Sequence, residues 1–228
     1  MSKKKLFIAG TDTDVGKTVI AAGLLAAANA QGLQTAAIKP LAAGCEKTDD
    51  GLRNADALLL QQTMSRKLPY TQINPVAFEE PIAPHIAADK AGKRLTVSQL
   101  AGYCRGALMS AADLTVVEGA GGWRVPLNRV ETLANLASEL NLPVVLVVGV
   151  RLGCINHALL TAEAIRHDGL QLAGWVANHI DPLMHYAEEN VETLKSLIAA
   201  PLLGSVPYLP NPSPEEVASY LYYDRIGN

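Results

Sequence analysis

The residues that could do chemistry are concentrated in Gly-Thr-Asp-Thr-Asp-Val-Gly-Lys-Thr, residues 10–18. An apolar run precedes this stretch and the Ala- and Leu-rich run 19–30 follows it, a pattern that predicts a strand, a phosphate-binding loop and a helix. Unpaired N–H groups and the helix dipole favour an anion at such a helix start. The ammonium group of Lys17 would reach the β- and γ-phosphates of a nucleotide, and the hydroxyl of Thr18 would ligate Mg²⁺. The first prediction is therefore a nucleoside triphosphate site.

This loop departs from the strict GxxxxGK[ST] spacing. Counting back from Gly16, the first glycine belongs at position 11, where Thr11 stands, and the available glycine is Gly10. The alternative interpretation is a strand-to-helix turn with an incidental Gly-Lys-Thr. The strand and helix patterns on either side of the loop argue against that alternative.

A second lysine is expected at the same edge of the sheet. Residues 35–38 form a short apolar run that ends in Lys39-Pro40, and proline biases the residue before it towards extended geometry. Lys39 is therefore expected at the carboxyl end of a strand, where open parallel sheets bind ligands. A solvated strand end is the plainer alternative, and the phosphate loop at the same edge favours a functional role.

Two carboxylates are candidates for holding the metal. Glu118 closes the apolar run 114–117, and the glycine-rich turn 119–122 follows it. An acid in that position contacts Mg²⁺ directly or through water, and the glycines let the backbone approach phosphates. A glycine-rich turn that an acid merely happens to lead is the alternative. Asp56 lies in the first turn of a helix expected at 55–63, where either the helix dipole or a metal contact explains it.

The composition of the 228 residues is that of a globular protein, with 49% hydrophobic and 18% charged residues. A net charge of −3 argues against a nucleic-acid-binding surface. No stretch approaches the ~18–20 apolar residues of a membrane helix, and the basic start lacks the apolar run of a signal peptide. Three widely spaced cysteines indicate reduced thiols rather than a metal site. We therefore expect a soluble, cytoplasmic protein.

Alternating strands and helices are expected to position these side chains. The expected strands are 5–9, 35–38, 114–117, 143–149, 172–177 and 201–206, and the expected helices are 17–30, 55–63, 83–90, 95–110, 130–141, 155–167, 186–198 and 215–223. Residues 41–54 are expected to form a loop, and residues 64–94 a loop-rich excursion around a short helix. Connections long enough to cross over predict one domain, residues 1–228, with the P-loop NTPase-type α/β fold: a doubly wound, mainly parallel sheet with helices on both faces.

Taken together, the motifs resemble those of the dethiobiotin synthetase family over nearly the full length of the chain. The resemblance rests on GTDTDVGKT, KPLAAG with EKTDDGLRNADALLLQ, INPVAF with EEPIAPH, VEGAGGW, VGVRLGCINHALLT, and GWVANHI with APLLGSVPYLP. It implies a ligase that makes dethiobiotin from 7,8-diaminopelargonic acid, CO₂ and MgATP, through a carbamate and its mixed anhydride with phosphate. It also implies a cytoplasmic homodimer with substrate at the interface, acting on small molecules and on neither nucleic acid nor membrane.

The resemblance further implies roles for individual residues. The implied catalytic residues are Lys39, Lys17 and Thr13, and the implied Mg²⁺ ligands are Thr18, Asp56 and Glu118. The implied nucleotide contacts are Asp14, Val15, Gly16, Lys17, Thr18, Val19, Asp56, Glu118, Gly119, Ala120, Gly121, Asn178, His179, Pro207, Tyr208 and Leu209. The implied substrate contacts are Thr13, Lys39, Gly121, Gly122, Cys154, Ile155 and Asn156. The turn 119–122 and the helix start 154–156 of one subunit would bind the carboxylate end of the substrate at the dimer interface.

Some positions depart from the family pattern. The family usually has serine where Ala43 stands, and the lost hydrogen bond to substrate is worth ~1 kcal/mol. The acidic residue of the family's terminal nucleotide loop cannot be assigned among residues 214–216. Asn178 and Asp181 also fit the guanine-reading pattern N-x-x-D, while Pro182 and the resemblance favour ATP over GTP.

Two other functions stay open on the sequence. A related amide ligase acting on cobyrinate-type carboxylates usually carries an appended glutamine-hydrolysing domain, for which 228 residues leave no room. A regulatory or partitioning ATPase commonly has a second lysine early in the phosphate loop, where this chain has Asp12 and Thr13.

Overall fold

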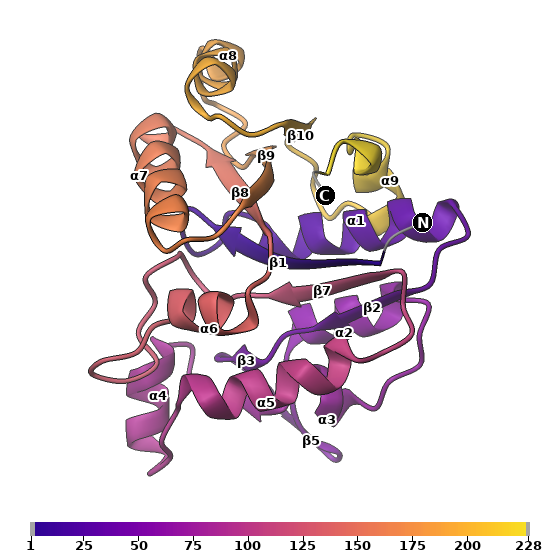
Figure 1. The fold of residues 1–228 in the computed structure, drawn as a ribbon, viewed down its shortest axis with the longest axis vertical. Helices are drawn as coiled ribbons and strands as arrows, with labels where there is room; N and C mark the ends of the chain where they lie inside the picture. The colour runs from indigo at the N-terminus through magenta and orange to yellow at the C-terminus, as the bar shows by residue number, and fades with distance from the viewer. Residues whose placement is uncertain (1–2, 227–228) are drawn as a thin grey trace.

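The centre of the molecule is a six-stranded sheet in a computed structural model that describes residues 3–226 (Figure 1). Its strands are β1 (Lys4–Gly10), β2 (Thr35–Ile38), β7 (Leu114–Glu118), β8 (Val144–Val150), β9 (Leu172–His179) and β10 (Leu202–Val206). They lie in the order β10-β9-β8-β1-β7-β2, and every neighbouring pair is parallel. This arrangement confirms the predicted doubly wound α/β fold.

Helices cover both faces of the sheet (Figure 1). They are α1 (Lys17–Ala30), α2 (Ala55–Thr63), α3 (Tyr70–Ile73), α4 (Pro84–Lys90), α5 (Val97–Leu108), α6 (Leu133–Leu140), α7 (Cys154–His167), α8 (Ala187–Leu197) and α9 (Pro214–Ala218), followed by a 3₁₀ turn at Tyr223–Arg225. One cluster of buried side chains joins α1, α2 and α9 to the sheet, and a second joins α5, α6, α7 and α8 to the opposite face. Within residues 3–226, no helix is long and apolar enough to cross a lipid bilayer.

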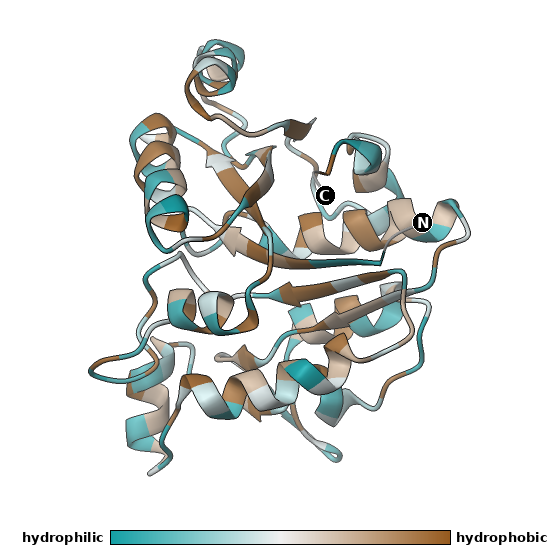
Figure 2. Cartoon of the chain, in the orientation of Figure 1, coloured by the Kyte–Doolittle hydropathy of each residue, from teal (hydrophilic) through white to brown (hydrophobic). Residues whose placement is uncertain are grey.

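Strand β8 shows how the sequence builds this two-sided core. Val144, Leu146 and Val148 belong to the buried cluster on the α7 side, whereas Val145 and Val147 belong to the cluster on the α1 side. All seven residues of the strand are buried, which explains the continuous apolar run in the sequence. Figure 2 shows the same feature as brown colouring along the central strands.

The connection between β2 and α2 is not the plain loop that was predicted for residues 41–54. It contains β3 (Leu41–Ala42) and an antiparallel hairpin of β4 (Glu46–Thr48) and β5 (Gly51–Arg53). Strand β3 pairs in parallel with β6 (Val76–Ala77), which lies in the predicted excursion 64–94 together with α3. Strands of two or three residues are too short for a period of two to be visible in the sequence.

The terminal helix predicted over residues 215–223 is wrong in its extent. Helix α9 ends at Ala218, and the chain then forms an isolated bridge between Gly204 and Leu221 before the 3₁₀ turn. Leu221 and Tyr223 are buried in the cluster that covers α1. Tertiary packing at this position therefore overrides the helical pattern.

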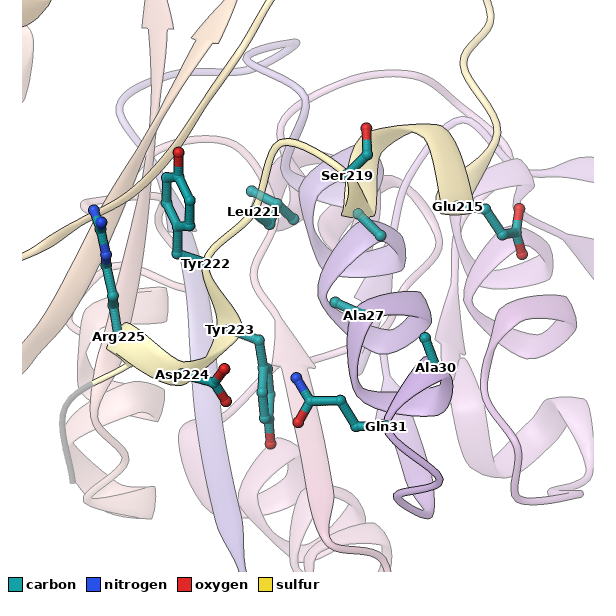
Figure 3. Close-up of a pocket in the computed structure, with 11 residues that line it drawn as sticks. Ala27, Ala30, Gln31, Glu215, Ser219, Leu221, Tyr222, Tyr223, Asp224 and Arg225 are labelled. Carbon is teal, nitrogen blue, oxygen red and sulfur yellow. The ribbon is translucent and has the colours of Figure 1, made fainter.

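A hollow of about 590 Å³ lies where the second half of α1 faces α9 and the 3₁₀ turn (Figure 3). Ala27, Ala30 and Gln31 form one side, and Tyr222 and Tyr223 belong to the opposite side. Since the phosphate loop precedes Lys17 at the other end of α1, this hollow lies away from it. No residue of the predicted site lines the hollow.

Candidate functional site

A cavity of about 800 Å³ opens where β1, β2 and β7 end. The predicted site residues that line it are Thr13, Asp14, Gly16, Lys17, Thr18, Val19, Lys39, Asp56, Glu118, Ala120 and Gly121. They come from segments far apart in the sequence. The carboxyl edge of the sheet brings them together, as expected for open parallel sheets.

The phosphate loop is fastened to the end of β9. Gly16 has a φ of 86°, and a Cβ on it would lie 2.2 Å from the amide nitrogen of Asn178. Glycine is required there both for the backbone conformation and for the close approach. The Asn178 amide donates a hydrogen bond of 2.9 Å to the carbonyl oxygen of Val15. The side chain of Val15 is buried in the core, so this loop residue is fixed both by its side chain and by its carbonyl oxygen.

Lys39 lies between two carboxylates. Its Nζ is 2.5 Å from Oε1 of Glu118 and 2.9 Å from Oδ2 of Asp56. The Thr18 hydroxyl donates to the same Glu118 oxygen at 2.8 Å. Lys39 and Glu118 are buried, with 5% and 1% of their surface exposed. The three predicted metal-site residues and the predicted catalytic lysine therefore form one cluster.

The second oxygen of Glu118, Oε2, is buried and has no hydrogen-bond partner among residues 3–226. Leaving a buried carboxylate oxygen unpaired is costly, so the cluster fits an additional cation. In the same described range, no three His, Cys, Asp or Glu side chains gather as a self-sufficient metal site. The two carboxylates of Asp56 and Glu118 and the hydroxyl of Thr18 match Mg²⁺, which proteins typically bind through one or two carboxylates together with substrate phosphates.

The second ammonium group, that of Lys17, points to the phosphate loop and donates to the carbonyl oxygen of Asp12 at 2.9 Å. Burial lowers the pKa of Lys17 to about 8, against the opposing attraction of Glu118. Burial also lowers the pKa of Lys39, but Glu118 and Asp56 outweigh it and raise that pKa above its usual value. One ammonium is thus held charged by the protein, and the other would gain from a bound anion.

The glycine-rich turn after β7 packs on the phosphate loop. Gly121 has a φ of 62°, and a Cβ on it would lie 2.8 Å from Val125 and 3.5 Å from the Thr13 hydroxyl. The Gly119 N–H donates to the carbonyl oxygen of Ile8 at 3.0 Å, which joins the start of the turn to β1. The turn therefore brings backbone close to the space in front of the loop, as its glycines predicted.

Other predicted site residues do not line the cavity. They are Val15, Gly119, Gly122, Cys154, Ile155, Asn156, Asn178, His179, Pro207, Tyr208 and Leu209. Cys154 is buried, whereas Asn156 is exposed at the start of α7. His179 is engaged with the Ser205 hydroxyl, 3.0 Å away, and Tyr208 is 49% exposed. Contacts of these residues with nucleotide or substrate stay predictions.

Sequence reasoning missed one part of the cavity wall. The additional lining residues are Ala42, Asn54, Pro81, Ile82, Ala83, Pro84, Val125 and Pro126. Asn54 is also the N-cap of α2 and accepts a hydrogen bond of 3.2 Å from the Ala57 N–H. The prolines of 81–84 signalled a loop, but nothing in the sequence placed that loop at the site. Ala43 also lines the cavity, so the departure from the family serine faces the site.

The fold and the loop at its strand edge define a protein of the P-loop NTPase class. A family model described as an AAA domain matches residues 4–216. The septum site-determining protein MinD from Pyrococcus horikoshii, solved in complex with Mg-ADP, is similar with a TM-score of 0.60 and 16% identity. The match covers 99% of this chain and 89% of that chain, and at this identity it shows the fold alone.

Much nearer relatives identify the family within that class. The ATP-dependent dethiobiotin synthetase BioD of Cellvibrio japonicus is 60% identical over 221 residues, which are 97% of this chain and 96% of that protein. The protein of the same name from Pseudomonas paraeruginosa is 59% identical over 221 residues, 97% of each chain. The chain belongs to the dethiobiotin synthetase family, as the motifs predicted.

Proposed function

We propose that the chain is an ATP-dependent dethiobiotin synthetase, a ligase that closes the ureido ring of dethiobiotin from 7,8-diaminopelargonic acid and CO₂. One structural observation supports the proposal independently of sequence similarity. Lys17 and Lys39, from separate segments, line one cavity together with Glu118. Residues 1–228 as one ligase domain are part of this proposal. Its cytoplasmic location, and small molecules rather than nucleic acid or membrane as ligands, belong to the proposal too.

ATP is proposed to bind with its phosphates over the start of α1. The backbone of residues 14–19 would surround them, and Lys17 would exchange the Asp12 carbonyl oxygen for phosphate oxygens. Asn178 lies against Gly16 at the side of the loop where the base would sit with residues 207–209. Since its Nδ2 donates to the Val15 carbonyl, its oxygen is left to accept from the amino group of adenine.

The same contacts favour ATP over GTP. Guanine presents a carbonyl oxygen where adenine has its amino group, and an acceptor cannot bind an acceptor. Asp181, the candidate guanine reader, uses its Oδ1 to accept a hydrogen bond of 3.0 Å from the Leu183 N–H within a turn.

The reaction follows from charge and position. One substrate amine adds to CO₂ and loses a proton to give a carbamate. A carbamate oxygen then attacks the γ-phosphorus and releases ADP. The second amine attacks the carbamate carbon, expels phosphate and loses a proton, which closes the ring. Lys17 and Lys39 would stabilise the charge that spreads over the transferring oxygens, with Thr13 beside them.

Two further features of the cavity suit this chemistry. CO₂ capture needs an unprotonated amine, and neighbouring ammonium groups disfavour a second positive charge on the substrate. Lys39 and Glu118 are buried, and a reacting end held against them would be shielded from water, which would protect the anhydride from hydrolysis.

We also propose that Thr18, Asp56 and Glu118 would hold Mg²⁺ with oxygens of the nucleotide, consistent with the unpaired Glu118 oxygen. The ion would supply charge neutralisation for the phosphates when it is bound. Lys39 shares its carboxylate partners with that site, so the protein must redistribute these contacts between the two cations.

A homodimer is proposed through the side of the molecule that carries α7 and α8, at the upper left of Figure 1. Leu152, Leu160, Leu183 and Tyr186 lie on α7 or in the loops beside it and are 91%, 57%, 82% and 75% exposed. Exposed apolar groups that gather in this way are typical of interfaces. Asn156 lies at the exposed start of α7, outside the cavity of its own chain, so it would meet substrate only across such an interface.

The test measures dethiobiotin and ADP together, with purified protein, MgATP, bicarbonate and 7,8-diaminopelargonic acid. The proposal expects ADP release only when both the diamine and bicarbonate are present, with one dethiobiotin for each ADP. A regulatory or partitioning ATPase would hydrolyse ATP without the diamine. Hydrolysis that is constitutive, or that yields no dethiobiotin, would overturn the proposed function.

A further inference from the structure

The Ile-Asn-Pro segment, residues 73–75, has no part in the proposed chemistry, yet it holds the backbone of Lys39. Asn74 is buried, and its Nδ2 donates a hydrogen bond of 2.8 Å to the Lys39 carbonyl oxygen. The Lys39 N–H donates to the Ile73 carbonyl oxygen, also at 2.8 Å. Strand β2 is the last strand of the sheet, and its pairing with β7 ends at Ile38. Lys39 therefore depends on residues 73 and 74, not on the sheet, for its backbone hydrogen bonds.

The same segment is tied to the start of α2, which carries Asp56. The hydroxyl of Tyr70 donates to Oδ1 of Asn74 at 3.1 Å and accepts from the backbone N–H of Asn54 at 2.7 Å. Asn54 is the N-cap of α2, and Asp56 lies in the first turn of that helix. The guanidinium of Arg53 lies 4.3 Å from the centre of the Tyr70 ring and holds the ring in place.

These bonds form a continuous relay from Asn54 through Tyr70 and Asn74 to Lys39, and its two ends line the cavity. In front of it, the side chains of Lys39 and Asp56 meet at 2.9 Å. The direct path along the chain between the two segments runs through the hairpin of β4 and β5, of which β4 is exposed throughout. The relay is thus a short, partly buried connection between the backbones that carry the proposed catalytic lysine and Asp56.

We infer that Tyr70 and Asn74 are positioning residues, which set the separation of Lys39 and Asp56 for the reaction. The inference rests on the proposed function. The phosphate loop connects β1 to α1. None of the hydrogen bonds described for this loop involves a residue of the relay. Loss of the relay should therefore slow the chemical step and leave nucleotide binding at Lys17 intact.

The first test is Tyr70→Phe, which removes the hydroxyl and keeps the ring under Arg53. We expect kcat for dethiobiotin formation to fall about tenfold to a hundredfold, since small misplacements of reacting groups have effects of that order. The affinity for ADP, measured by calorimetry without the diamine, should change less than about twofold. Tyr103→Phe, at an exposed tyrosine of α5, is the matched control and should leave both values unchanged.

The second test compares Asn74→Asp with Asn74→Ala. In Asn74→Asp, an ionised carboxylate would place an acceptor against the Lys39 carbonyl oxygen, whereas a protonated carboxyl could donate to that oxygen and restore the bond. The activity of Asn74→Asp relative to wild type should therefore recover as the pH is lowered, and that of Asn74→Ala should not.

Three results would overturn the inference. The first is that the Tyr70 and Asn74 variants have a lower melting temperature but an unchanged kcat per folded enzyme. The relay would then contribute to stability alone. The second is an equal loss of ADP affinity and kcat, which indicates general distortion of the site. The third is the same pH response in both Asn74 variants. Failure of the proposed function is recognised separately, since wild-type protein would then form no dethiobiotin.

Discussion

At the scale of single residues, Lys39 serves two sets of partners. It is a proposed catalytic ammonium that stabilises the transferring phosphoryl group, and it neutralises Glu118 and Asp56, the proposed ligands of Mg²⁺. Two cations within about 3 Å of the same carboxylates repel each other strongly at the low effective dielectric of a buried site. Lys39 therefore balances the negative charge of the two carboxylates before the nucleotide binds, and Mg²⁺ and Lys39 would compete for these carboxylates.

Replacement of Lys39 by methionine tests this competition. We expect dethiobiotin formation to fall by ~10³-fold or more, the loss typical of a charge that stabilises phosphoryl transfer. We also expect the variant to bind Mn²⁺ about tenfold more tightly than wild type in the absence of nucleotide, because the competing charge is gone. Electron paramagnetic resonance titration measures the second effect. Lys47→Met, at an exposed lysine, is the control, and equal Mn²⁺ affinities in wild type and Lys39→Met would contradict the prediction.

Ala43→Ser probes the position in the cavity wall at which the family resemblance implies a serine. A serine hydroxyl there would regain a substrate hydrogen bond worth ~1 kcal/mol, which lowers KM for the diamine up to about fivefold. Steady-state kinetics at saturating ATP would show the change in KM with little change in kcat. A KM equal to that of wild type would mean that position 43 does not reach the diamine.

At the scale of elements, helix α5 buries Cys104 against the sheet. Burial raises the pKa of this thiol to about 12, from an ordinary value of 9.0. Between these two pH values the unfolded chain loses the thiol proton while the folded chain keeps it. The unfolded state then binds fewer protons, so the contribution of Cys104 to stability falls as the pH rises through this window.

Two measurements check this. Iodoacetamide at about pH 8 should leave Cys104 unmodified in the native protein and alkylate it in urea, as read by peptide mass spectrometry. Urea unfolding should show that the stability difference between wild type and Cys104→Ala shrinks from about pH 8 to about pH 10. Rapid alkylation of Cys104 in the folded protein would contradict the assigned burial.

The elements also show what the sequence could predict and what it could not. Helices α1 and α2 have the predicted bounds, because each begins at a clear local signal, the phosphate loop in one and Asn54 in the other. The phosphate-loop side of the site was predictable for the same reason. Strands β3 and β6 pair across the chain and have only two residues each, too few to leave a pattern. The loop 81–84 and the bond from Asn74 to Lys39, 35 residues apart, likewise depend on tertiary packing.

At the scale of the whole molecule, the proposed site is formed partly within one chain and partly by residues that lie outside its cavity. The cavity at the strand edge is lined from within one chain by the phosphate loop, Lys39 and the turn after β7. In contrast, the proposed substrate contact Asn156, in the first turn of α7, is exposed and lies outside that cavity. The exposed leucines beside it would be covered by a second copy, which would also bring this helix start to a substrate.

Leu152→Asp tests the proposed interface. A charge at this 91% exposed position has no effect on a monomer, but in a dimer it would be buried without a partner. We expect light scattering to show a monomer, with KM for the diamine raised at least about tenfold. ADP affinity should be retained, since the nucleotide is proposed to bind within one chain. Val130→Asp is the matched control, because Val130 is 87% exposed in the loop between β7 and α6 and is not part of the proposed interface. A Leu152→Asp protein that stays dimeric with an unchanged KM, or a Val130→Asp protein that dissociates in the same way, would refute the interface.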